Sequence, residues 1–208
     1  MTTRIILVGG GTGSGKSALA DALVRRLAPA LRIHEDDYYV CSSAVPDFDP
    51  RTYNFDVPEA KDLGLLAAHL DALRIGREVA APRYDFALHQ RMAEPQRLAP
   101  AATIIVEGLH AMLSDAVRAR ADFCVFVDAP EEVRLARRLV RDVRERGRDI
   151  EGIVAQFLGA VRPMHALYVE PQRALADLVV DADRDTPDVL CARVADALER
   201  SPRSEAGR

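Results

Sequence analysis

Short apolar runs alternate along the chain with longer segments whose apolar residues recur at helical spacing. The helical pattern is clearest over residues 16–28 and from about residue 59 to residue 75. Short apolar runs that alternate with helices are typical of parallel strands buried on both faces. The runs that predict strands are residues 5–8, 31–34, 103–106, 123–127 and 178–180. We therefore expect an α/β fold, with a parallel sheet of about five strands and helices on both faces.

The segments between these elements are less regular. Residues 40–58 contain Pro46, Pro50 and Pro58 among polar and aromatic residues, which predicts a long loop, and such loops are usually functional or mobile. Residues 78–99 predict a small β-hairpin, and residues 201–208 form a polar tail. The length of 208 residues is that of one domain, which we place at residues 1–200.

The first apolar run leads directly into a glycine-rich segment. Residues 10–17 fit the pattern G-x-x-x-x-G-K-[ST], and the pattern stands between a predicted strand and a predicted helix, as a P-loop requires. Glycine allows positive φ and lets backbone N–H groups approach an anion, and the helix that follows directs its positive dipole end to the same point. The segment therefore predicts a nucleoside triphosphate site, with Lys16 at the β/γ-phosphates and Ser17 as a Mg²⁺ ligand. Its expected nucleotide-binding residues are Gly10, Gly11, Thr12, Gly13, Ser14, Gly15, Lys16, Ser17 and Ala18.

Lysine usage supports this prediction. The chain has 28 Lys plus Arg residues, and among them only Lys16 and Lys61 are lysine. Arginine carries a bulky planar fork, whereas a tight phosphate cradle needs the slimmer ammonium group. A chain that uses arginine almost everywhere but keeps lysine at position 16 is consistent with a phosphate-binding role there.

Acidic residues follow several of the predicted strands. Ligands of open parallel sheets bind at the carboxyl ends of the strands, and phosphoryl transfer needs carboxylates for the attacking hydroxyl and for Mg²⁺. Asp36 and Glu107 are the natural pair, and Asp37 competes with Asp36 for the first role. A buried structural carboxylate is the alternative for Glu107. Asp128 is expected to be an N-cap or turn residue before a helix that begins near Pro130.

The helix expected from about residue 131 is rich in arginine. Arg137, Arg141, Arg144 and Arg148 fall at helical spacing, and Gly147 interrupts the run. The ordinary interpretation is a solvated face with ion pairs to Asp142 and Glu145. Because the arginines outnumber these acids and arginine clamps transferring phosphates, we expect a lid at about residues 134–150.

Composition and charge narrow the function further. The net charge of −4 argues against a general nucleic-acid-binding surface, and no apolar run reaches membrane-spanning length. The three cysteines show no CxxC spacing, so we expect a reducing, cytoplasmic location without a signal peptide. Aromatic residues are 5% of the chain but gather between residues 38 and 86, close to His89, where they could form a stacking pocket or simply core.

Several motifs together resemble one family. The segments GGTGSGKS, EDDYY, NFDVPEA, PRYDFALHQR, IIVEG and RRLVRDVRERGRD occur in the order and spacing of the uridine/cytidine kinases, in the phosphoribulokinase-like branch of P-loop kinases. The resemblance covers about residues 4–185, and PRYDF…H with the arginine-rich segment carries it most specifically. Val57 stands where the family usually has His, Phe157 where Tyr is common, and the usual lysine–acid pair after Tyr39 is missing.

The resemblance implies roles for individual residues. It implies that Asp36 is the general base at a nucleoside 5′-hydroxyl, that Lys16 and Arg141 assist the transfer, and that Arg146 contacts the nucleotide. Substrate contacts would fall within an insert at about residues 38–98 and in the lid. The implied contacts are Asp56 and Arg138 to the ribose, Tyr84 and His89 to the pyrimidine edge, Tyr39, Phe55 and Phe86 around the base, Arg148 in the lid, and Gln156 to the sugar. Ser17, Glu107 and Asp36 are the implied Mg²⁺ group.

These observations predict an enzyme that transfers the γ-phosphate of ATP or GTP, with Mg²⁺, to the 5′-hydroxyl of uridine and of cytidine in pyrimidine salvage. The resemblance also implies a homotetramer. One alternative is a kinase of the same branch for another small hydroxyl acceptor, such as nicotinamide riboside, pantothenate or a sugar phosphate. The PRYDF segment with His89 argues against it. The other alternative is a nucleotide-binding regulator, which has no need of Asp36 beside an acceptor site.

Overall fold

The central sheet of the computed structural model, which describes residues 3–50 and 52–201, has five parallel strands in the order β2-β7-β1-β8-β9. The strands are β1 (Arg4–Gly10), β2 (Ala30–His34), β7 (Thr103–Gly108), β8 (Phe123–Asp128) and β9 (Leu178–Asp181). All four neighbouring pairs are parallel. The α/β fold and the five strands predicted from the apolar runs are confirmed.

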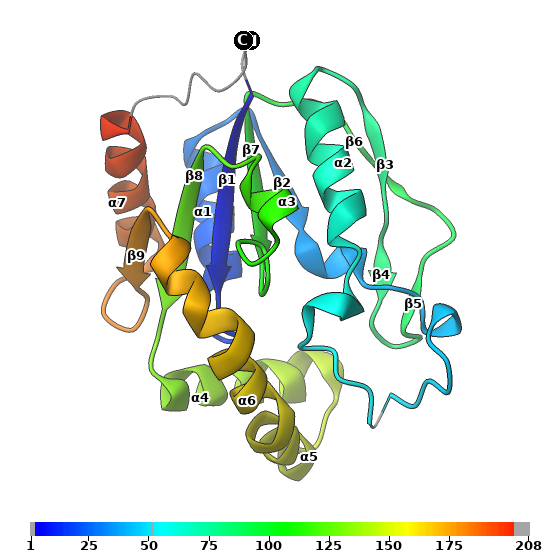
Figure 1. Cartoon of the computed structure of the whole chain (residues 1–208). Coiled ribbons are helices and arrows are strands. Elements are labelled where there is room, and N and C mark those ends of the chain that lie inside the picture. The colour runs from blue at the N-terminus through cyan, green and yellow to red at the C-terminus, as the bar shows by residue number, and fades with distance from the viewer. Residues whose placement is uncertain (1–2, 51, 202–208) are drawn as a thin grey trace.

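Two hydrophobic clusters cover the two faces of this sheet. Along β1, Ile5 and Leu7 point into one cluster while Ile6 and Val8 point into the other, because side chains alternate along a strand. The second cluster packs against α1 (Lys16–Arg26) and α7 (Pro187–Arg200), and the first against α2 (Leu63–Arg74) and α3 (Asp115–Arg118). Figure 1 shows this arrangement, with α4 (Glu131–Arg146) and α5 (Ile150–Gln156) lying beyond the arrowheads of the strands. The carboxyl ends of the strands therefore face the arginine-rich helix.

The helix boundaries differ from the sequence prediction at two places. The helix expected from residue 59 begins at Leu63, since Asp62 is its N-cap and accepts a hydrogen bond from the Leu65 N–H at 2.9 Å. Pro58–Ala60 forms a separate 3₁₀ turn. Of the two roles expected for Asp128, N-cap or turn residue, the N-cap is wrong: Pro130 holds the N-cap position of α4, and Asp128 ends β8 with its carboxylate accepting from Arg173.

The insert between β2 and β7 contains two short antiparallel pairs. Strand β3 (Val79–Ala81) pairs with β6 (Gln96–Leu98), and β4 (Tyr84–Asp85) pairs with β5 (Gln90–Arg91) inside the same excursion of the chain. This is the hairpin predicted at residues 78–99, interrupted between its two paired parts. Residues 40–50 and 52–57 form the expected long loop and include a 3₁₀ turn at Ser42–Ala44.

Residues 150–175 form a succession of helical segments that the sequence analysis did not predict. After α5, π-helical turns at Phe157–Val161 and His165–Val169 flank α6 (Arg162–Met164), and a 3₁₀ helix covers Glu170–Leu175. None of the helices in the described part of the chain combines the length and apolar character that crossing a bilayer requires. The predicted tail at residues 201–208 lies, apart from Ser201, outside the described residues.

Candidate active site

The glycine-rich loop between β1 and α1 adopts the backbone that the motif predicts. Gly10, Gly13 and Gly15 have φ values of 143°, 75° and 100°. A Cβ atom at Gly10 or Gly13 would collide with the backbone oxygen of Val127 or Arg134, so glycine is required at both positions. The loop thus packs directly against β8 and α4, and α1 begins at Lys16.

The Lys16 ammonium is held by a hydrogen bond to its own loop. Its Nζ donates to the Gly11 carbonyl at 3.1 Å. Burial lowers the pKa of Lys16, while the nearby Glu107 and Asp36 carboxylates oppose that shift. A desolvated ammonium with one backbone acceptor suits a group that binds an anion.

Ser17, in the first turn of α1, contacts Glu107 across the cavity lining. The Ser17 hydroxyl lies 3.2 Å from both carboxylate oxygens of Glu107, which ends β7. Arg32 and His34 of β2 each approach Glu107 Oε1 at 2.9 Å. Burial opposes ionisation, but the hydrogen bond with His34 and the charges of Lys16 and Arg32 prevail and lower the pKa of Glu107 to about 2. A hydroxyl and an ionised carboxylate are ligands that Mg²⁺ prefers, so this pair fits that ion.

The side chains of Asp36 and Asp37 have different surroundings in the structure. Both lie in the 3₁₀ turn Glu35–Tyr38 that follows β2. Asp36 lines the cavity, whereas the Asp37 carboxylate accepts a hydrogen bond from the Tyr84 N–H at 3.2 Å. Burial alone would raise the pKa of Asp36, but Lys61, whose Nζ lies 2.7 Å from Asp36 Oδ1, lowers it to about 2. Asp37 therefore fixes the strand that carries Tyr84, and Asp36 faces the open site.

Aromatic rings form one wall of the site. Tyr39 packs on Tyr84 at 5.2 Å between ring centroids and on Phe55 at 5.9 Å. The His89 imidazole stacks on Phe55 at 5.1 Å with an interplanar angle of 27°. Phe86 is 46% exposed and lies under the Arg146 guanidinium, 5.6 Å from ring centroid to Cζ. The predicted base-contacting residues are thus gathered on one side.

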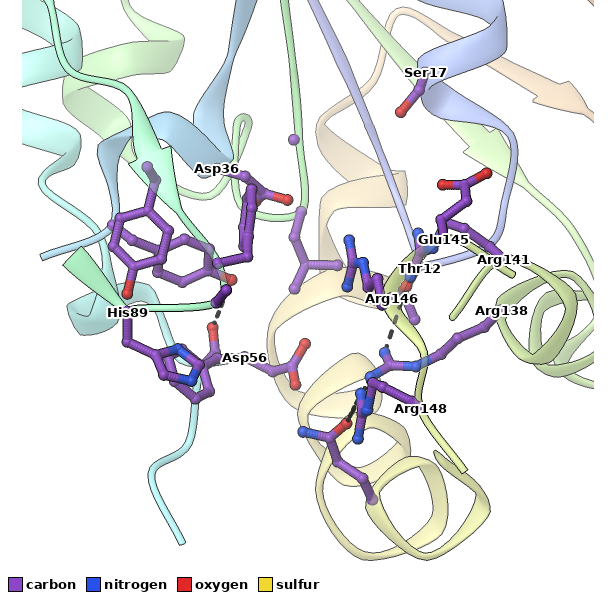
Figure 2. A pocket seen from close by; sticks show the side chains of 18 of the residues that line it. Thr12, Ser17, Asp36, Asp56, His89, Arg138, Arg141, Glu145, Arg146 and Arg148 are labelled. Carbon is purple, nitrogen blue, oxygen red and sulfur yellow. Dashed lines mark hydrogen bonds between the residues drawn. The ribbon is translucent and has the colours of Figure 1, made fainter. Parts of the chain in front are cut away.

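Arginines form the opposite wall, and they share one carboxylate. The Asp142 side chain is fully buried, and four guanidinium groups lie within ion-pair distance of it. They are Arg141 at 2.8 Å, Arg138 and Arg148 at 3.5 Å, and Arg146 at 3.7 Å. Arg138 and Arg148 also donate to Gln156 Oε1 at 2.8 and 2.9 Å, and Arg138 lies 3.5 Å from the Thr12 hydroxyl. Figure 2 shows these arginines facing Asp36 and His89, with Asp56 pointing between the two sides.

The predicted helical face of Arg137, Arg141, Arg144 and Arg148 is wrong for Arg148, while the other three lie within α4. Gly147 ends α4 with a φ of 61°, so helical spacing does not continue to Arg148, whose N–H returns to the Asp142 carbonyl. Arg137 turns away and donates to the Ala182 carbonyl at 2.8 Å. The arginines that meet in the cavity are Arg138, Arg141, Arg146 and Arg148.

One cavity of about 750 Å³ joins the two sides. The predicted site residues that line it are Thr12, Lys16, Ser17, Asp36, Tyr39, Phe55, Asp56, Tyr84, Phe86, His89, Glu107, Arg138, Arg141, Arg146, Arg148 and Gln156. The remaining predicted residues, Gly10, Gly11, Gly13, Ser14, Gly15 and Ala18, form the loop and the first turn of α1 beside it. Three residues at the site were not predicted from the sequence: Glu145, which lines the cavity, and Lys61 and His110, which lie beneath it. The rarity of lysine in the chain was the only signal for Lys61.

His110 leads to a prediction about stability. It is fully buried, and its Nε2 lies 3.0 Å from the Asp56 carbonyl. Burial, together with the nearby Lys61 ammonium, lowers the pKa of His110 to about 3. Because the folded pKa is below the unfolded one, the neutral ring's contribution is present above about pH 6.5 and is lost as the pH falls towards 3. From pH 7 to pH 5 we expect His110 to cost the wild type about 2 kcal/mol of unfolding free energy.

His110→Gln isolates this effect, because glutamine keeps an amide donor but does not titrate. Denaturant melts of both proteins at pH 7 and pH 5 measure it, and Glu35 and Lys61, which face His110, are present in both. An equal loss of stability in the two proteins would contradict the prediction.

The glycine-rich loop at the end of β1, the parallel sheet and the cavity lined by carboxylates and arginines together define a P-loop kinase. The chain matches the phosphoribulokinase / uridine kinase family over residues 5–187 and belongs to that family. It is 38% identical over 209 residues to a uridine kinase of Chloroflexus aurantiacus (97% of this chain, all of the relative) and 36% identical over 208 residues to one of Clostridium tetani (97% and 100%). The fold is similar to that of phosphoribulokinase from Rhodobacter spheroides, at a TM-score of 0.60 and 18% identity, covering 90% of this chain and 74% of that one.

Proposed function

We propose that this kinase transfers the γ-phosphate of ATP to the 5′-hydroxyl of uridine, and also of cytidine. The observation that carries the proposal is a cavity that Asp36 lines together with P-loop residues and the aromatic wall. Relatives named uridine kinase, matched over nearly their whole length, support the nucleoside substrate. Kinases for other small hydroxyl acceptors and non-catalytic regulators are not favoured by these relatives.

The proposed mechanism is mostly positioning and charge neutralisation. The P-loop and Lys16 hold the β- and γ-phosphates, and Ser17 with Glu107 would hold Mg²⁺, which neutralises phosphate charge when bound. Asp36 accepts a hydrogen bond from the nucleoside 5′-hydroxyl and takes its proton as that oxygen bonds to the γ-phosphorus and the bond from the γ-phosphorus to the bridging oxygen breaks, so that ADP leaves. Arg141 and Arg146 stabilise the charge on the transferring group.

On the substrate side, Asp56 is proposed to accept hydrogen bonds from the ribose hydroxyls and Arg138 to donate to them, with Gln156 as a further sugar contact. Burial raises the pKa of Asp56, and the Arg138 guanidinium opposes that shift. His89 and Tyr84 are proposed to contact the pyrimidine edge, with Tyr39, Phe55 and Phe86 around the ring. Arg148 is proposed to close over the substrate from the lid. We also propose GTP as a second phosphate donor and a cytoplasmic location. We further propose a homotetramer, and sedimentation would test that oligomeric state.

An ADP-release assay tests the function directly. It uses MgATP and a panel of acceptors: uridine, cytidine, thymidine, adenosine, nicotinamide riboside and pantothenate. Turnover confined to uridine and cytidine is expected. Turnover with another acceptor would overturn the proposed roles of Tyr84 and His89, and no turnover with any acceptor, with ATP still bound, would overturn the kinase proposal in favour of a regulator.

A further inference from the structure

A buried cluster of charged side chains lies directly beneath the acceptor side of the cavity. The Lys61 side chain is fully buried, as is that of Glu35. Lys61 Nζ donates to Glu35 Oε1 and, at 2.7 Å, to Asp36 Oδ1. The Asp36 side chain is half exposed, and it lines the cavity while Lys61 does not. Lys61 therefore contacts the proposed base from behind.

The backbone holds Lys61 firmly in this place. Lys61 pairs with Tyr39 in an antiparallel bridge, and the flanking hydrogen bonds run from the Val40 N–H to the Ala60 carbonyl at 3.0 Å and from the Asp62 N–H to the Tyr38 carbonyl at 2.9 Å. This ties the segment before α2 to the chain that leaves the Asp36 turn. The ammonium also lies 4.7 Å from the centre of the Tyr39 ring, where a cation is favoured.

The Glu35 carboxylate compensates the charge of the buried Lys61 ammonium. Its carboxylate accepts the His110 N–H at 2.9 and 3.1 Å and faces Lys61 on its other side. A Cβ at Gly108 would collide with the Glu35 side chain, so glycine at this position leaves the space that Glu35 occupies. Removing one partner from a buried ion pair is costly because it leaves the other charge unpaired. Glu35 and Lys61 thus form a pair whose second contact is the cavity-facing Asp36.

We propose that Lys61 is a positioning residue for phosphoryl transfer, and that its buried ammonium fixes the Asp36 carboxylate beside the acceptor hydroxyl. The proposal rests on the proposed function. A compact ammonium suits the task, because it directs separate N–H donors to the two carboxylates of Glu35 and Asp36. It also counters the repulsion between the adjacent carboxylates Glu35 and Asp36. Both lysines of this arginine-rich chain then serve one reaction, Lys16 from the donor side and Lys61 from behind the base.

The test compares Glu35→Gln, Lys61→Met and the double variant in kcat, KM for each substrate, and melting temperature. Glu35→Gln keeps the contact between Lys61 and Asp36, so its kcat should stay close to wild type. Lys61→Met should lower stability, since Glu35 is left unpaired. The double variant removes both buried charges and should regain stability, yet its kcat should remain about 10–100-fold below wild type with an unchanged KM for ATP. A double variant with wild-type kcat would overturn the proposal and leave Lys61 as a partner for Glu35 alone.

A second comparison separates positioning from a general loss of structure. In an Asp36→Asn background, adding Glu35→Gln and Lys61→Met together should lower kcat no further, because the carboxylate that Lys61 positions is already gone. An equal further loss in that background would overturn the proposal. Failure of the proposed function looks different, since the wild type itself would then not phosphorylate uridine or cytidine. The variants would in that case be measured with whichever acceptor the wild type uses.

Discussion

Asp36→Asn is expected to lower kcat for uridine by about 10²–10⁴-fold, the usual contribution of a general base. The asparagine side chain has nearly the same volume and can still accept a hydrogen bond from Lys61, so nucleoside binding should change little. What is lost is the negative charge that takes up the hydroxyl proton. Steady-state kinetics with calorimetric binding of uridine measures both quantities.

Asp37→Asn is the matched control, because asparagine at that position can still accept the Tyr84 N–H that Asp37 now accepts. Its kcat should stay near the wild-type value. Unchanged turnover in Asp36→Asn would remove Asp36 from the mechanism. A large loss in Asp37→Asn instead would return the role of base to Asp37.

Lys16→Met is expected to lower kcat by at least about 10³-fold, at the upper end of the loss when one charge-stabilising donor is removed. The Lys16 ammonium donates to the Gly11 carbonyl of its own loop, and methionine keeps the length of the side chain, so the melting transition should be retained. Uridine should still bind, because the aromatic wall and Asp56 are untouched. Thermal melts and calorimetry check the fold and the binding, and ADP release checks the chemistry.

Lys16→Arg sharpens the test, since it keeps the charge and changes only the shape of the cation. The narrow loop around Gly13, against which the Arg134 backbone packs, should not accept the wider guanidinium, and turnover should stay low. Substantial activity in Lys16→Arg would show that charge alone matters at this position. Wild-type kcat in Lys16→Met would exclude Lys16 from catalysis.

Much of the donor side could be predicted from sequence, because its physical requirements are local. Glycine spacing between a strand and a helix fixed the expectation of positive φ at Gly10, Gly13 and Gly15, and the structure confirms all three. The strands followed from their apolar runs for a similar reason, since burial on both faces leaves a simple pattern. Glu107 was found because an acidic residue at the end of such a run is rare.

The remaining features depend on contacts between distant segments. The residues adjacent to Asp36 and Asp37 do not show which of the two carboxylates faces the cavity. The contact that separates them comes from the insert, where the Tyr84 N–H donates a hydrogen bond to Asp37. Lys61 and His110 are far from Glu35 in sequence, so their shared cluster has no local signature. Residues 150–175 escaped prediction because Gly159, Pro163 and Pro171 interrupt the pattern, and the chain responds with π-helical and 3₁₀ turns.

The buried Asp142 carboxylate also bears on the thermodynamics of nucleotide binding. Four long, flexible side chains would normally lose rotational freedom when they close on a phosphate, at a cost of about 0.5–1.5 kcal/mol each. Here Asp142 imitates the anion and has already gathered Arg138, Arg141, Arg146 and Arg148 around one point. In the proposed mechanism, an arriving triphosphate would exchange partners with Arg141 and Arg146 instead of ordering them. Asp142 thus preorganises the arginines of the proposed lid for an anion. Part of the conformational entropy that they would lose on nucleotide binding is already lost when the protein folds.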